Sequence, residues 1–461
     1  MLEQEYRLEF FQRNGFQRRI CPSCQSPFWC QDPSRERCGD QPCVTYEFIG
    51  KPVTKRKYTL TEMREKYLTF LEERGHKRVA RYPVVARWRD DIYLTIASIA
   101  DFQPHVTSGV VPPPANPLCI SQPCIRLNDL DSVGRSGRHL TCFEMMAHHV
   151  FNTPDKEVYW KDRTVELCHE FLTKALGIEG KAISYKENPW AGGGNAGPAV
   201  EVLVGGLEVA TLVFMNMRID PQGSIDLKGE KYSMMPLRIV DTGYGLERLV
   251  WASNGAPSLY EALWPDLLKQ LKQRAKLDHD LADPKLQNIL AHTVKLSGMM
   301  SVETNTKLLA LREEVARKLA DEGVAITAQE LDATLRPLES LYALADHSRT
   351  LAFMLGDGIV PSNVKGGYLA RLVLRRTLRL LEELKMDMKL TELLELQLQV
   401  LGKDFPELRV NKDTMMRIAD LETERYRETL EKGTRLVERE AKKLGQAGAI
   451  PVEKLIELYD S

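Results

Sequence analysis

Residues 239–251 combine an acid, two glycines and an arginine within one short stretch of this 461-residue chain. Two apolar residues lead into Asp241, and a helical pattern that contains Arg248 follows the glycines. We expect a strand that ends at Asp241 and a helix that begins near Tyr244 or Leu246. An acid and an arginine that face one small gap could bind an amino group and a phosphate.

The two glycines of this stretch, Gly243 and Gly245, have no Cβ atoms, so a ligand could approach the backbone closely there. A Gly-x-Gly pair also occurs in simple turns, and this second interpretation stays open. Asp241-Thr-Gly is also the sequence of an aspartic protease site, but that chemistry needs two carboxylates that share one proton. Since the chain contains no second Asp-Thr-Gly or Asp-Ser-Gly, only a homodimer could supply the other carboxylate.

A second stretch, residues 121–146, carries much of the remaining polar chemistry. We expect a strand, a polar loop over residues 128–137, and a second strand. This hairpin would bring Arg126 close to Phe143. An arginine beside an aromatic ring suits a nucleotide, because the guanidinium can bind phosphate and the ring can stack on a base. A solvated hairpin with exposed arginines is the alternative.

Five of the nine cysteines precede residue 44, and four of these form two close pairs. Cys21 with Cys24 and Cys38 with Cys43 could supply four thiolates to a tetrahedral zinc ion. Cys30 is then the spare thiol. The spacing of the second pair is wider than the commonest one, and reduced structural cysteines are the alternative.

Residues 188–198 form a segment that is too rich in glycine to belong to the core, so we expect a loop. Its single tryptophan, Trp190, could form one wall of a small pocket. The segment is not a phosphate-binding loop of the Gly-Lys-Ser/Thr kind, because no lysine follows the glycines. The adjacent His148 and His149 have no Glu-x-x-His spacing beside them, so we expect a structural role for this pair.

Regular elements must position these side chains. Thr59 and Glu62 have the spacing of a capping box, so a helix begins there, and Gly75 ends it. Its predicted buried face consists of Met63, Tyr67, Phe70 and Leu71. Short apolar stretches then predict a mostly antiparallel sheet with strands at 84–88, 92–99, 118–127, 139–146, 200–204 and 207–217. A helical stretch at 157–176 interrupts them, and helices follow Ser258 nearly throughout.

Residues 368–384 predict one of the later helices. A helical wheel places four arginines on one arc: Arg371, Arg375, Arg376 and Arg379. The opposite arc is apolar and consists of Val373, Leu374, Leu380, Leu381 and Leu384. A basic stripe outside a buried face suits a phosphate backbone, while a solvated charged face is the alternative.

Composition limits the classes of partner and location. Lys and Arg number 63 against 64 Asp and Glu, so nucleic-acid binding must depend on local basic patches. No apolar run approaches the roughly 18 residues of a membrane span, and the N-terminus lacks the apolar core of a signal peptide. The odd number of cysteines favours reduced thiols, so we expect a cytoplasmic protein with no membrane partner.

Together these motifs resemble those of alanyl-tRNA synthetases of the archaeal type, a class II aminoacyl-tRNA synthetase family. The stretch from Asp241 to Arg248 is similar to the family's motif 3. Ser121-Gln-x-Cys-Ile-Arg126, Val133-Gly and Arg138-His-x-Thr-x-Phe143-Glu144-Met are similar to its motif 2. Later blocks follow in the family's order, namely Asn188-x-Trp190, Val213-Phe-Met215, Ala345-Asp-His-x-Arg349 and Asp357-Gly-x-x-Pro-Ser-Asn363. The resemblance covers nearly the whole chain.

The resemblance implies an α+β fold, with an antiparallel class II catalytic sheet flanked by helices. The implied domains are a cysteine-rich extension at 1–58, a catalytic domain at 59–256 and an all-α acceptor-stem domain at 257–461. The implied enzyme is an alanine–tRNA ligase that activates L-alanine with ATP and transfers it to the 3′ end of tRNA(Ala). It reads a G·U pair in the acceptor stem, uses Mg²⁺, carries Zn²⁺ and is monomeric.

The resemblance also implies roles for single residues. Arg126 holds the α-phosphate and Phe143 stacks on adenine. Arg248 covers the other adenine face and reaches the γ-phosphate, and Asp241 pairs with the alanine ammonium group. The other implied ligands are Arg138, His139 and Glu201 for ATP and its Mg²⁺, Trp190, Val213, Asn216 and Gly243 for alanine, and Asn363, Asp460 and the four arginines of the stripe for tRNA.

The sequence departs from the family pattern in two places. The bacterial Gly-Gly-Lys-His-Asn loop of motif 2 is absent, so the role of its lysine is lost or moves to Arg135 or Arg138. The chain also ends where the family continues into editing and oligomerisation domains, which predicts a fragment or one half of a split enzyme that leaves mischarged tRNA uncleared. The alternatives are a non-catalytic RNA-binding paralogue and a zinc-finger module, which explains only residues 1–58.

Overall fold

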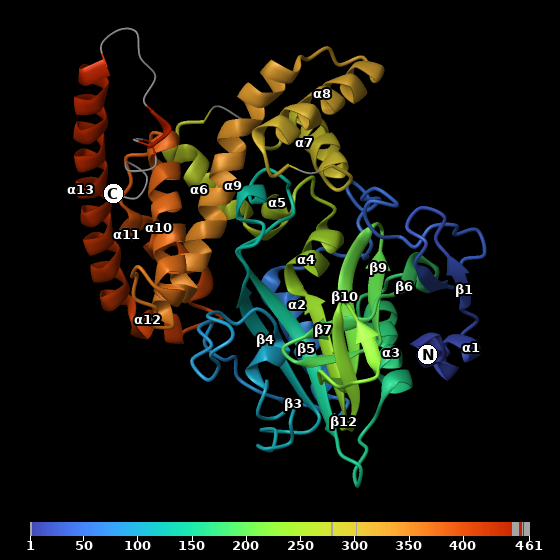
Figure 1. Ribbon diagram of the computed structural model, residues 1–461. Coiled ribbons are helices and arrows are strands. Elements are labelled where there is room, and N and C mark those ends of the chain that lie inside the picture. The colour runs from blue at the N-terminus through green and yellow to red at the C-terminus, as the bar shows by residue number, and fades with distance from the viewer. Residues whose placement is uncertain (1, 278–279, 301, 445–450, 454, 456–461) are drawn as a thin grey trace. The chain divides into compact units, whose positions relative to one another are not determined.

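A computed structural model of the chain describes residues 2–277, 280–300, 302–444, 451–453 and 455. The chain divides into two compact units, Met1–Asp346 and His347–Ser461. The first unit is built on one large sheet with flanking helices, and the described part of the second consists of helices and their connections (Figure 1). The predicted α+β class is confirmed. Among the described residues, no helix is both long and apolar enough to cross a membrane.

The sheet has twelve strands, and its main path follows the order β1-β2-β6-β9-β10-β12-β5-β4-β3. Among the described strands, the short pairing of β3 with β4 is the only parallel one. The strands of this path are β1 Gln17–Ile20, β2 Pro27–Cys30, β6 Ile183–Glu187, β9 Ala199–Val204, β10 Leu207–Ile219, β12 Glu230–Gly245, β5 Cys142–Asn152, β4 Leu118–Ile125 and β3 Lys77–Arg78. The others are β7 Trp190–Gly192, β8 Asn195–Gly197 and β11 Ile225–Leu227.

Helices dominate after the sheet, as the sequence predicts. Those up to the unit boundary are α1 Glu9–Arg13, α2 Leu60–Glu72, α3 Lys161–Glu170, α4 Leu246–Asn254, α5 Leu259–Leu263, α6 Pro265–Arg274, α7 Pro284–Ser297, α8 Asn305–Asp321 and α9 Ala328–Gly356, which continues past it. The second unit adds α10 Lys365–Glu383, α11 Leu390–Leu401, α12 Glu407–Val410 and α13 Lys412–Leu444. Short helical turns are η1 Leu2–Tyr6, η2 Ser98–Asp101, η3 Leu130–Ser132, η4 Phe171–Ala175 and η5 Gly180–Ala182.

Helix α2 forms as its sequence predicts. The Thr59 side chain accepts a hydrogen bond from Glu62 N at 3.2 Å, and Glu62 Oε2 accepts one from Thr59 N at 2.9 Å, which completes the capping box. All four residues of the predicted apolar face are buried: Met63, Tyr67, Phe70 and Leu71. Such a box satisfies two backbone donors of the first turn and so defines where the helix starts.

The two faces of the central sheet have different covers. Helices α2, α3 and α4 pack on one face, and the segment around η2 packs on the other. Because side chains alternate along a strand, two adjacent histidines of β5 point to opposite faces. The Nδ1 atom of His148 lies 3.2 Å from the Tyr67 hydroxyl on α2, whereas Nε2 of His149 lies 3.1 Å from the Ser98 hydroxyl on η2.

The predicted strands at 84–88 and 92–99 are wrong. A single bridge joins Val85 to Leu94, and the second segment enters η2 at Ser98. The side chains between the two segments are polar and bond locally, with Arg89 Nε donating to Asp91 at 2.8 Å. The alternation that a strand needs is therefore not sustained.

The predicted loop at 188–198 is also wrong, because β7 and β8 form a small hairpin there. Gly193 and Gly194 have φ values of +56° and +81°, which suit its tight turn. Strand β8 then pairs with β10, and a Cβ atom on Gly197 would lie only 1.9 Å from the Phe214 carbonyl oxygen. The glycines thus permit close backbone packing in the sheet.

Candidate active site

A cavity of about 370 Å³ opens on the sheet face that η2 covers. It collects most of the side chains predicted for ATP and alanine: Arg126, Arg138, His139, Phe143, Trp190, Glu201, Val213, Asp241, Gly243 and Arg248. Asn216 is not among the lining residues. It is buried on β10, and its Oδ1 atom has no hydrogen-bond partner among the described residues.

Arg126 and Phe143 face each other at one end of the β4–β5 pair. Cys124 is the register partner of Phe143, so Arg126 follows it closely. The Cζ atom of Arg126 lies 5.0 Å from the centroid of the Phe143 ring, and Nε donates to the Ile96 carbonyl at 2.9 Å. The predicted proximity is confirmed. With Nε engaged, the two Nη groups can donate to an anion, and the ring can stack on a base.

Strand β12 continues to Gly245, so the prediction that it ends at Asp241 is wrong. The glycines are paired strand residues and do not form a turn. A Cβ atom on Gly243 would lie 2.9 Å from the Met145 sulfur, so glycine leaves room for a side chain of the neighbouring strand. Helix α4 begins at Leu246, which is one of the two predicted positions.

The Asp241 carboxyl group is buried in the wall of the cavity, with 7% of the residue exposed. Its register partners are Val213 on β10 and His149 on β5. Its Oδ1 atom lies 3.4 Å from His149 Nδ1. Burial raises the pKa of the Asp241 carboxyl to about 7. A buried acid beside a valine suits a ligand that carries a cation next to a small apolar group.

Arg248 stands at the start of α4 and remains 47% exposed. Its Nη1 atom donates to the carboxylate and to the backbone carbonyl of Glu208, each at 3.0 Å. Desolvation acts to raise the pKa of Glu208, but the charge of Arg248 holds this pKa below its ordinary value. One guanidinium edge is thus fixed by the protein, which orients the exposed remainder toward the cavity.

The sequence did not predict Glu208 as a site residue. The β9–β10 register shifts between Glu208 and Ala210, which is a β-bulge. A bulge re-aims side chains, so Glu208 and Thr211 meet, with the hydroxyl donating at 2.6 Å. Strict alternation along β10 would separate these two residues, and the sequence carries no plain signal for the bulge.

Glu201 lines the cavity from β9, opposite Lys186 of β6. Its carboxylate accepts a hydrogen bond from Asn188 Nδ2 at 2.5 Å and lies 3.0 Å from the Lys186 ammonium group. Desolvation, together with the charge of Glu208, raises the pKa of Glu201. A carboxylate whose pKa is raised by burial and by a neighbouring carboxylate lies in an environment that suits a divalent cation with oxygen ligands.

Arg138 and His139 close the side of the cavity that follows the polar loop. Arg138 Nη1 donates to the Tyr46 hydroxyl at 3.0 Å, and His139 Nδ1 lies 2.8 Å from the Ser136 hydroxyl. Desolvation and the neighbouring Arg138 lower the pKa of His139 to about 4. The imidazole is therefore neutral near pH 7 and can take part in hydrogen bonds without adding charge.

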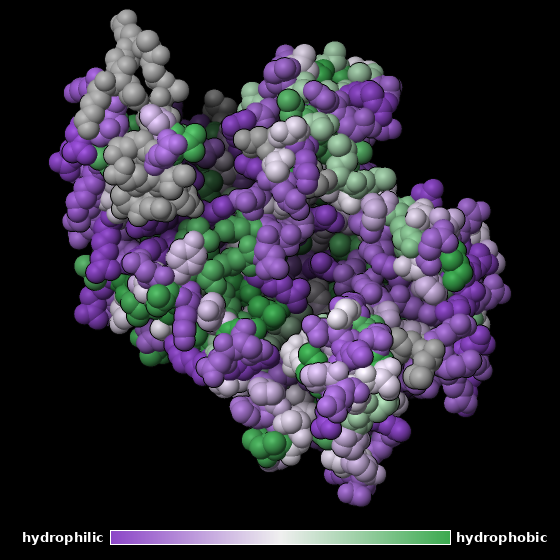
Figure 2. All heavy atoms as spheres, in the orientation of Figure 1, coloured by the Kyte–Doolittle hydropathy of each residue, from purple (hydrophilic) through white to green (hydrophobic). Residues whose placement is uncertain are grey.

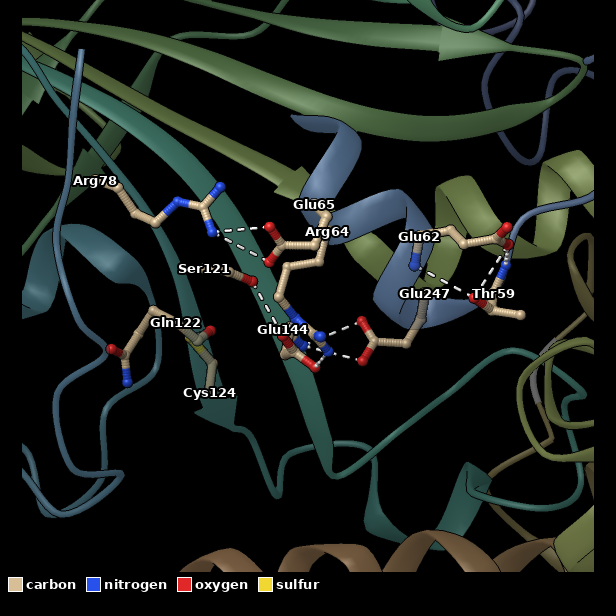
Figure 3. Close-up of polar contacts among 10 residues, drawn as sticks. All are labelled: Thr59, Glu62, Arg64, Glu65, Arg78, Ser121, Gln122, Cys124, Glu144 and Glu247. Carbon is tan, nitrogen blue, oxygen red and sulfur yellow. Dashed lines mark hydrogen bonds and ion pairs between the residues drawn. The ribbon is translucent and has the colours of Figure 1, made fainter. Parts of the chain in front are cut away.

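A buried ionic network (Figure 3) adjoins the cavity, which Glu247 of the network lines. Arg64 of α2 donates to both oxygens of Glu144, from Nε at 2.6 Å and from Nη2 at 2.7 Å. The Ser121 hydroxyl donates to Glu144 Oε2 at 3.0 Å. The Glu247 carboxylate accepts hydrogen bonds from the Glu144 backbone N–H at 3.0 and 3.1 Å. This network joins α2, β4 and β5 to the residue that precedes Arg248.

Sequence reasoning missed this network as well. Its one signal is Arg64, a charged residue adjacent to the apolar face of α2, and Arg64 is 7% exposed. A cation that is so deeply buried needs a partner. The sequence does not say which carboxylate supplies it, because Glu144 lies 80 positions away.

The predicted zinc ligands come together in the N-terminal region. The sulfur atoms of Cys21, Cys24, Cys38 and Cys43 all lie within 4.8 Å of one another, and Cys24 and Cys38 are separated by 3.9 Å. Sulfur atoms around a tetrahedral zinc ion lie about 3.8 Å apart at a Zn–S distance of about 2.3 Å. Cys30 is outside the group. The cluster therefore fits a zinc ion.

The second unit holds the residues predicted for tRNA. Asn363 is exposed before α10, and its Oδ1 accepts a hydrogen bond from Arg371 Nη1. Arg371 also donates twice to Glu422 of α13, at 2.9 Å each. Arg379 is exposed, whereas Arg375 and Arg376 are half-buried. The predicted Asp460 lies outside the described residues.

Comparison with known proteins adds to this geometry. A family model described as tRNA synthetases class II (A) matches residues 62–461. The chain is similar to an alanine–tRNA ligase of Methanothrix thermoacetophila, with 58% identity over 460 residues, and to one of Methanosarcina barkeri, with 56% identity over 462 residues. Each alignment covers 100% of the chain and 49% of the relative, so the chain spans about half the length of these relatives.

The matched region includes the cavity, the ionic network beneath it and the helices of the second unit. The predicted resemblance to archaeal alanyl-tRNA synthetases is confirmed, and so is the predicted class II fold. The chain therefore belongs to the class II tRNA synthetase family.

Proposed function

We propose that the chain activates L-alanine with ATP and transfers the alanyl group to tRNA(Ala). The observation that supports this most directly is that one cavity holds the buried acid Asp241 together with Arg126, Arg248 and Phe143. An amino acid and a nucleoside triphosphate need this set of groups: an acid for the ammonium group, cations for the phosphates and a ring for the base. The alanine–tRNA ligases to which the chain is similar support the choice of substrate.

In the proposed reaction, the alanine carboxylate attacks the α-phosphorus of ATP, which gives alanyl-adenylate and releases pyrophosphate. A terminal ribose hydroxyl of the tRNA then attacks the activated carbonyl and releases AMP. No bond to the protein forms, so positioning and charge stabilisation supply the rate enhancement. Arg126 binds the α-phosphate, Arg248 reaches the γ-phosphate, and Phe143 stacks on adenine. Arg138 and His139 complete the ATP site.

The alanine site in this proposal surrounds Asp241. The carboxylate pairs with the ammonium group, while Trp190, Val213 and Gly243 enclose the methyl group, and all four line the cavity. We also propose Asn216 as a ligand: it does not line the cavity, but its buried Oδ1 atom has no hydrogen-bond partner among the described residues. Such a pocket discriminates poorly against glycine, which is smaller, and against serine, which adds one hydroxyl.

Mg²⁺, when bound, would neutralise phosphate charge in this site. Glu201, with Glu208 beside it, is the carboxylate that would hold the ion, since both line the cavity and oxygen ligands suit Mg²⁺. The four cysteines of the N-terminal region would hold zinc in a structural role. We propose that residues 1–58 bind zinc, residues 59–256 carry out catalysis and residues 257–461 bind tRNA. We also propose that the protein is cytoplasmic and monomeric.

For tRNA, we place Asn363 and Asp460 at the G·U pair of the acceptor stem and the arginines of α10 at nearby phosphates. Asn363 is exposed, and an amide offers both a donor and an acceptor to the minor groove. Arg371 donates a hydrogen bond to the Asn363 side chain and is itself bound by Glu422. The Asn363 amide is therefore oriented before tRNA binds. Arg379 is the exposed cation of the stripe.

Alanine-dependent exchange of pyrophosphate into ATP tests the activation step. We expect exchange with alanine, weaker exchange with serine and glycine, and none with larger amino acids. A non-catalytic paralogue with the same fold would show no exchange with any amino acid.

Charging of two tRNAs that differ only in G·U or G·C at the acceptor pair tests recognition. The Asn363→Ala variant should lower charging of the wobble tRNA and reduce the preference, while alanine activation stays intact. An unchanged preference for the G·U tRNA would show that a residue other than Asn363 recognises the pair.

A further inference from the structure

His149 is a buried histidine that the activation chemistry above does not use. It lies on β5, fully buried, directly across the strand register from Asp241. Its Nδ1 atom is 3.4 Å from Asp241 Oδ1, and its Nε2 atom is 3.1 Å from the Ser98 hydroxyl. Ser98 is itself fully buried at the start of η2, between two residues that line the cavity, Ala97 and Ile99.

Both nitrogen atoms of the imidazole lie near a polar group, but within the described part of the chain only Nε2 makes a hydrogen bond of good geometry, with Ser98. Nδ1 has no hydrogen bond of good geometry among the described residues, although Asp241 Oδ1 lies 3.4 Å away and the Val240 backbone interacts with the ring. The ring packs against Phe102, with 5.4 Å between the ring centroids. A buried polar nitrogen without a full partner is costly, so a purely structural role gives no reason for histidine here.

We propose that His149 is a positioning residue for the alanine-binding carboxylate of Asp241, and that Ser98 orients the imidazole ring by its contact with Nε2. In this arrangement Nδ1–H donates to Asp241 Oδ1, and Nε2 accepts from the Ser98 hydroxyl. The second carboxylate oxygen is then left for the ammonium group. The proposal rests on the proposed function, because it concerns how that same pocket holds alanine.

The environment supports a neutral donor at this place. Burial lowers the pKa of His149 to about 3, so the ring does not add a positive charge that would repel the ammonium group. The 3.4 Å separation is long for a hydrogen bond, and contacts of this kind commonly shorten when the ligand binds. A donor on one oxygen also restricts rotation of the carboxylate, which keeps the other oxygen aimed at the cavity.

The adjacent residue supplies a matched control. His148 is also fully buried on β5, but its ring points to the opposite face, toward Tyr67 of α2. A leucine at either position removes one buried imidazole from the same strand. Loss of stability is therefore expected from both changes, while loss of alanine binding is expected only from the change at position 149.

The test measures pyrophosphate exchange at saturating ATP over a range of alanine concentrations, using the whole chain. We expect His149→Leu to raise the KM for alanine about tenfold with a smaller change in kcat, because hydrogen bonds to charged groups have this order of effect. His149→Asn keeps an N–H donor near the position of Nδ1 and should restore most of the affinity. Ser98→Ala should raise the KM two- to threefold, and His148→Leu should leave it unchanged.

The outcomes separate the inference from the proposed function. No alanine-dependent exchange by the unaltered chain would overturn the proposed function itself. Normal exchange by the unaltered chain, with the same alanine KM in His149→Leu, would overturn the positioning role. If His149→Leu does not fold, His149→Asn, His149→Gln and Ser98→Ala decide, since only the Asn variant keeps the donor near Nδ1. Equal alanine KM values in the Asn and Gln variants would also overturn the role.

Discussion

Two buried carboxylates on adjacent strands of this protein have opposite surroundings. Glu144 on β5 is fully buried and receives hydrogen bonds from two nitrogens of Arg64 and from the Ser121 hydroxyl. Asp241 on β12 is nearly as buried, yet among the described residues its closest ionisable partner is His149 at 3.4 Å. Burial raises the pKa of Asp241 to about 7. One carboxylate is saturated by the protein, and the other retains capacity for a ligand.

This difference distinguishes a supporting charge from a binding charge. A buried ion pair with full hydrogen bonding holds its elements in register, and breaking it leaves an uncompensated charge. A buried carboxylate without such partners is destabilising by itself, and where it lines a cavity it marks a candidate site for a cationic ligand. Most of the face shown in Figure 2 is hydrophilic. Glu144 and Asp241 are both buried.

The cysteine cluster extends the comparison to thiolates that a metal ion compensates. We expect one zinc ion per chain, bound by Cys21, Cys24, Cys38 and Cys43, and the largest loss of stability on its removal. Structural zinc in zinc-finger peptides contributes on the order of 10 kcal/mol of apparent binding free energy. Metal analysis and thermal unfolding with and without a chelator measure this. Absence of zinc from protein with four freely titratable thiols would contradict the assignment.

Removal of Arg64 tests the saturated carboxylate. In Arg64→Met, Glu144 is left buried without its cation, and we expect a loss of about 3–5 kcal/mol in the free energy of unfolding. Denaturant unfolding measures it. The double variant with Glu144→Leu should recover much of this loss, because both charges are then absent. Equal stability of the single variant and the unaltered chain would remove the distinction between the two carboxylates.

Asp241→Ala tests the carboxylate that lacks strong internal partners. It should impair alanine activation and leave stability unchanged. We expect a loss of about 10- to 100-fold in kcat/KM for alanine, since a charge-assisted hydrogen bond contributes about 1.5–3 kcal/mol. Stability should not fall, because no strong internal bond is lost. Pyrophosphate exchange, ATP binding and unfolding measure the three quantities. Normal exchange kinetics would show that another group binds the ammonium.

The raised pKa of Asp241 makes a pH prediction with a definite sign. The pKa is about 7 in the folded chain and lies above the ordinary carboxyl value. Between the ordinary value and pH 7, the folded state therefore binds more protons than the unfolded state. This group therefore favours folding at low pH, and the contribution is lost as pH rises toward 7. Asp241→Asn should stabilise the chain more at pH 8 than at pH 5. In the unaltered chain, kcat/KM for alanine should fall up to tenfold per unit below pH 7.

The smallest effect is expected at the exposed end of the α10 stripe. Arg379→Gln should weaken tRNA binding modestly and equally for G·U and G·C acceptor stems, and should reduce the salt dependence by about one phosphate contact. Arg371→Gln, in contrast, releases Glu422 and Asn363 and should also lower stability. Binding titrations at several salt concentrations compare the two. Identical effects of the two variants on tRNA binding and stability would show that Arg371 and Arg379 do not differ in role.

Local features of this chain were predictable from sequence because they act over a few residues. The capping box of α2 depends on two side chains three positions apart, and it forms as predicted. The β4–β5 pair joins two strands that follow one another along the chain, so Arg126 meets Phe143 as expected. The cysteine spacing likewise brought four thiols together. In each case the covalent distance is short and leaves few alternative arrangements.

Contacts across the sheet were decided only by the tertiary structure. Asp241 meets His149 because β12 continues past its predicted end and pairs with β5 in one register. Glu208 reaches Arg248 through a bulge that shifts β10 by one residue, and Arg64 finds Glu144 80 positions away. A register shift of one residue turns each side chain to the other face, so these meetings depend on the packing of the whole sheet. The sequence determines which groups are available for chemistry, and strand pairing determines which of them face one another.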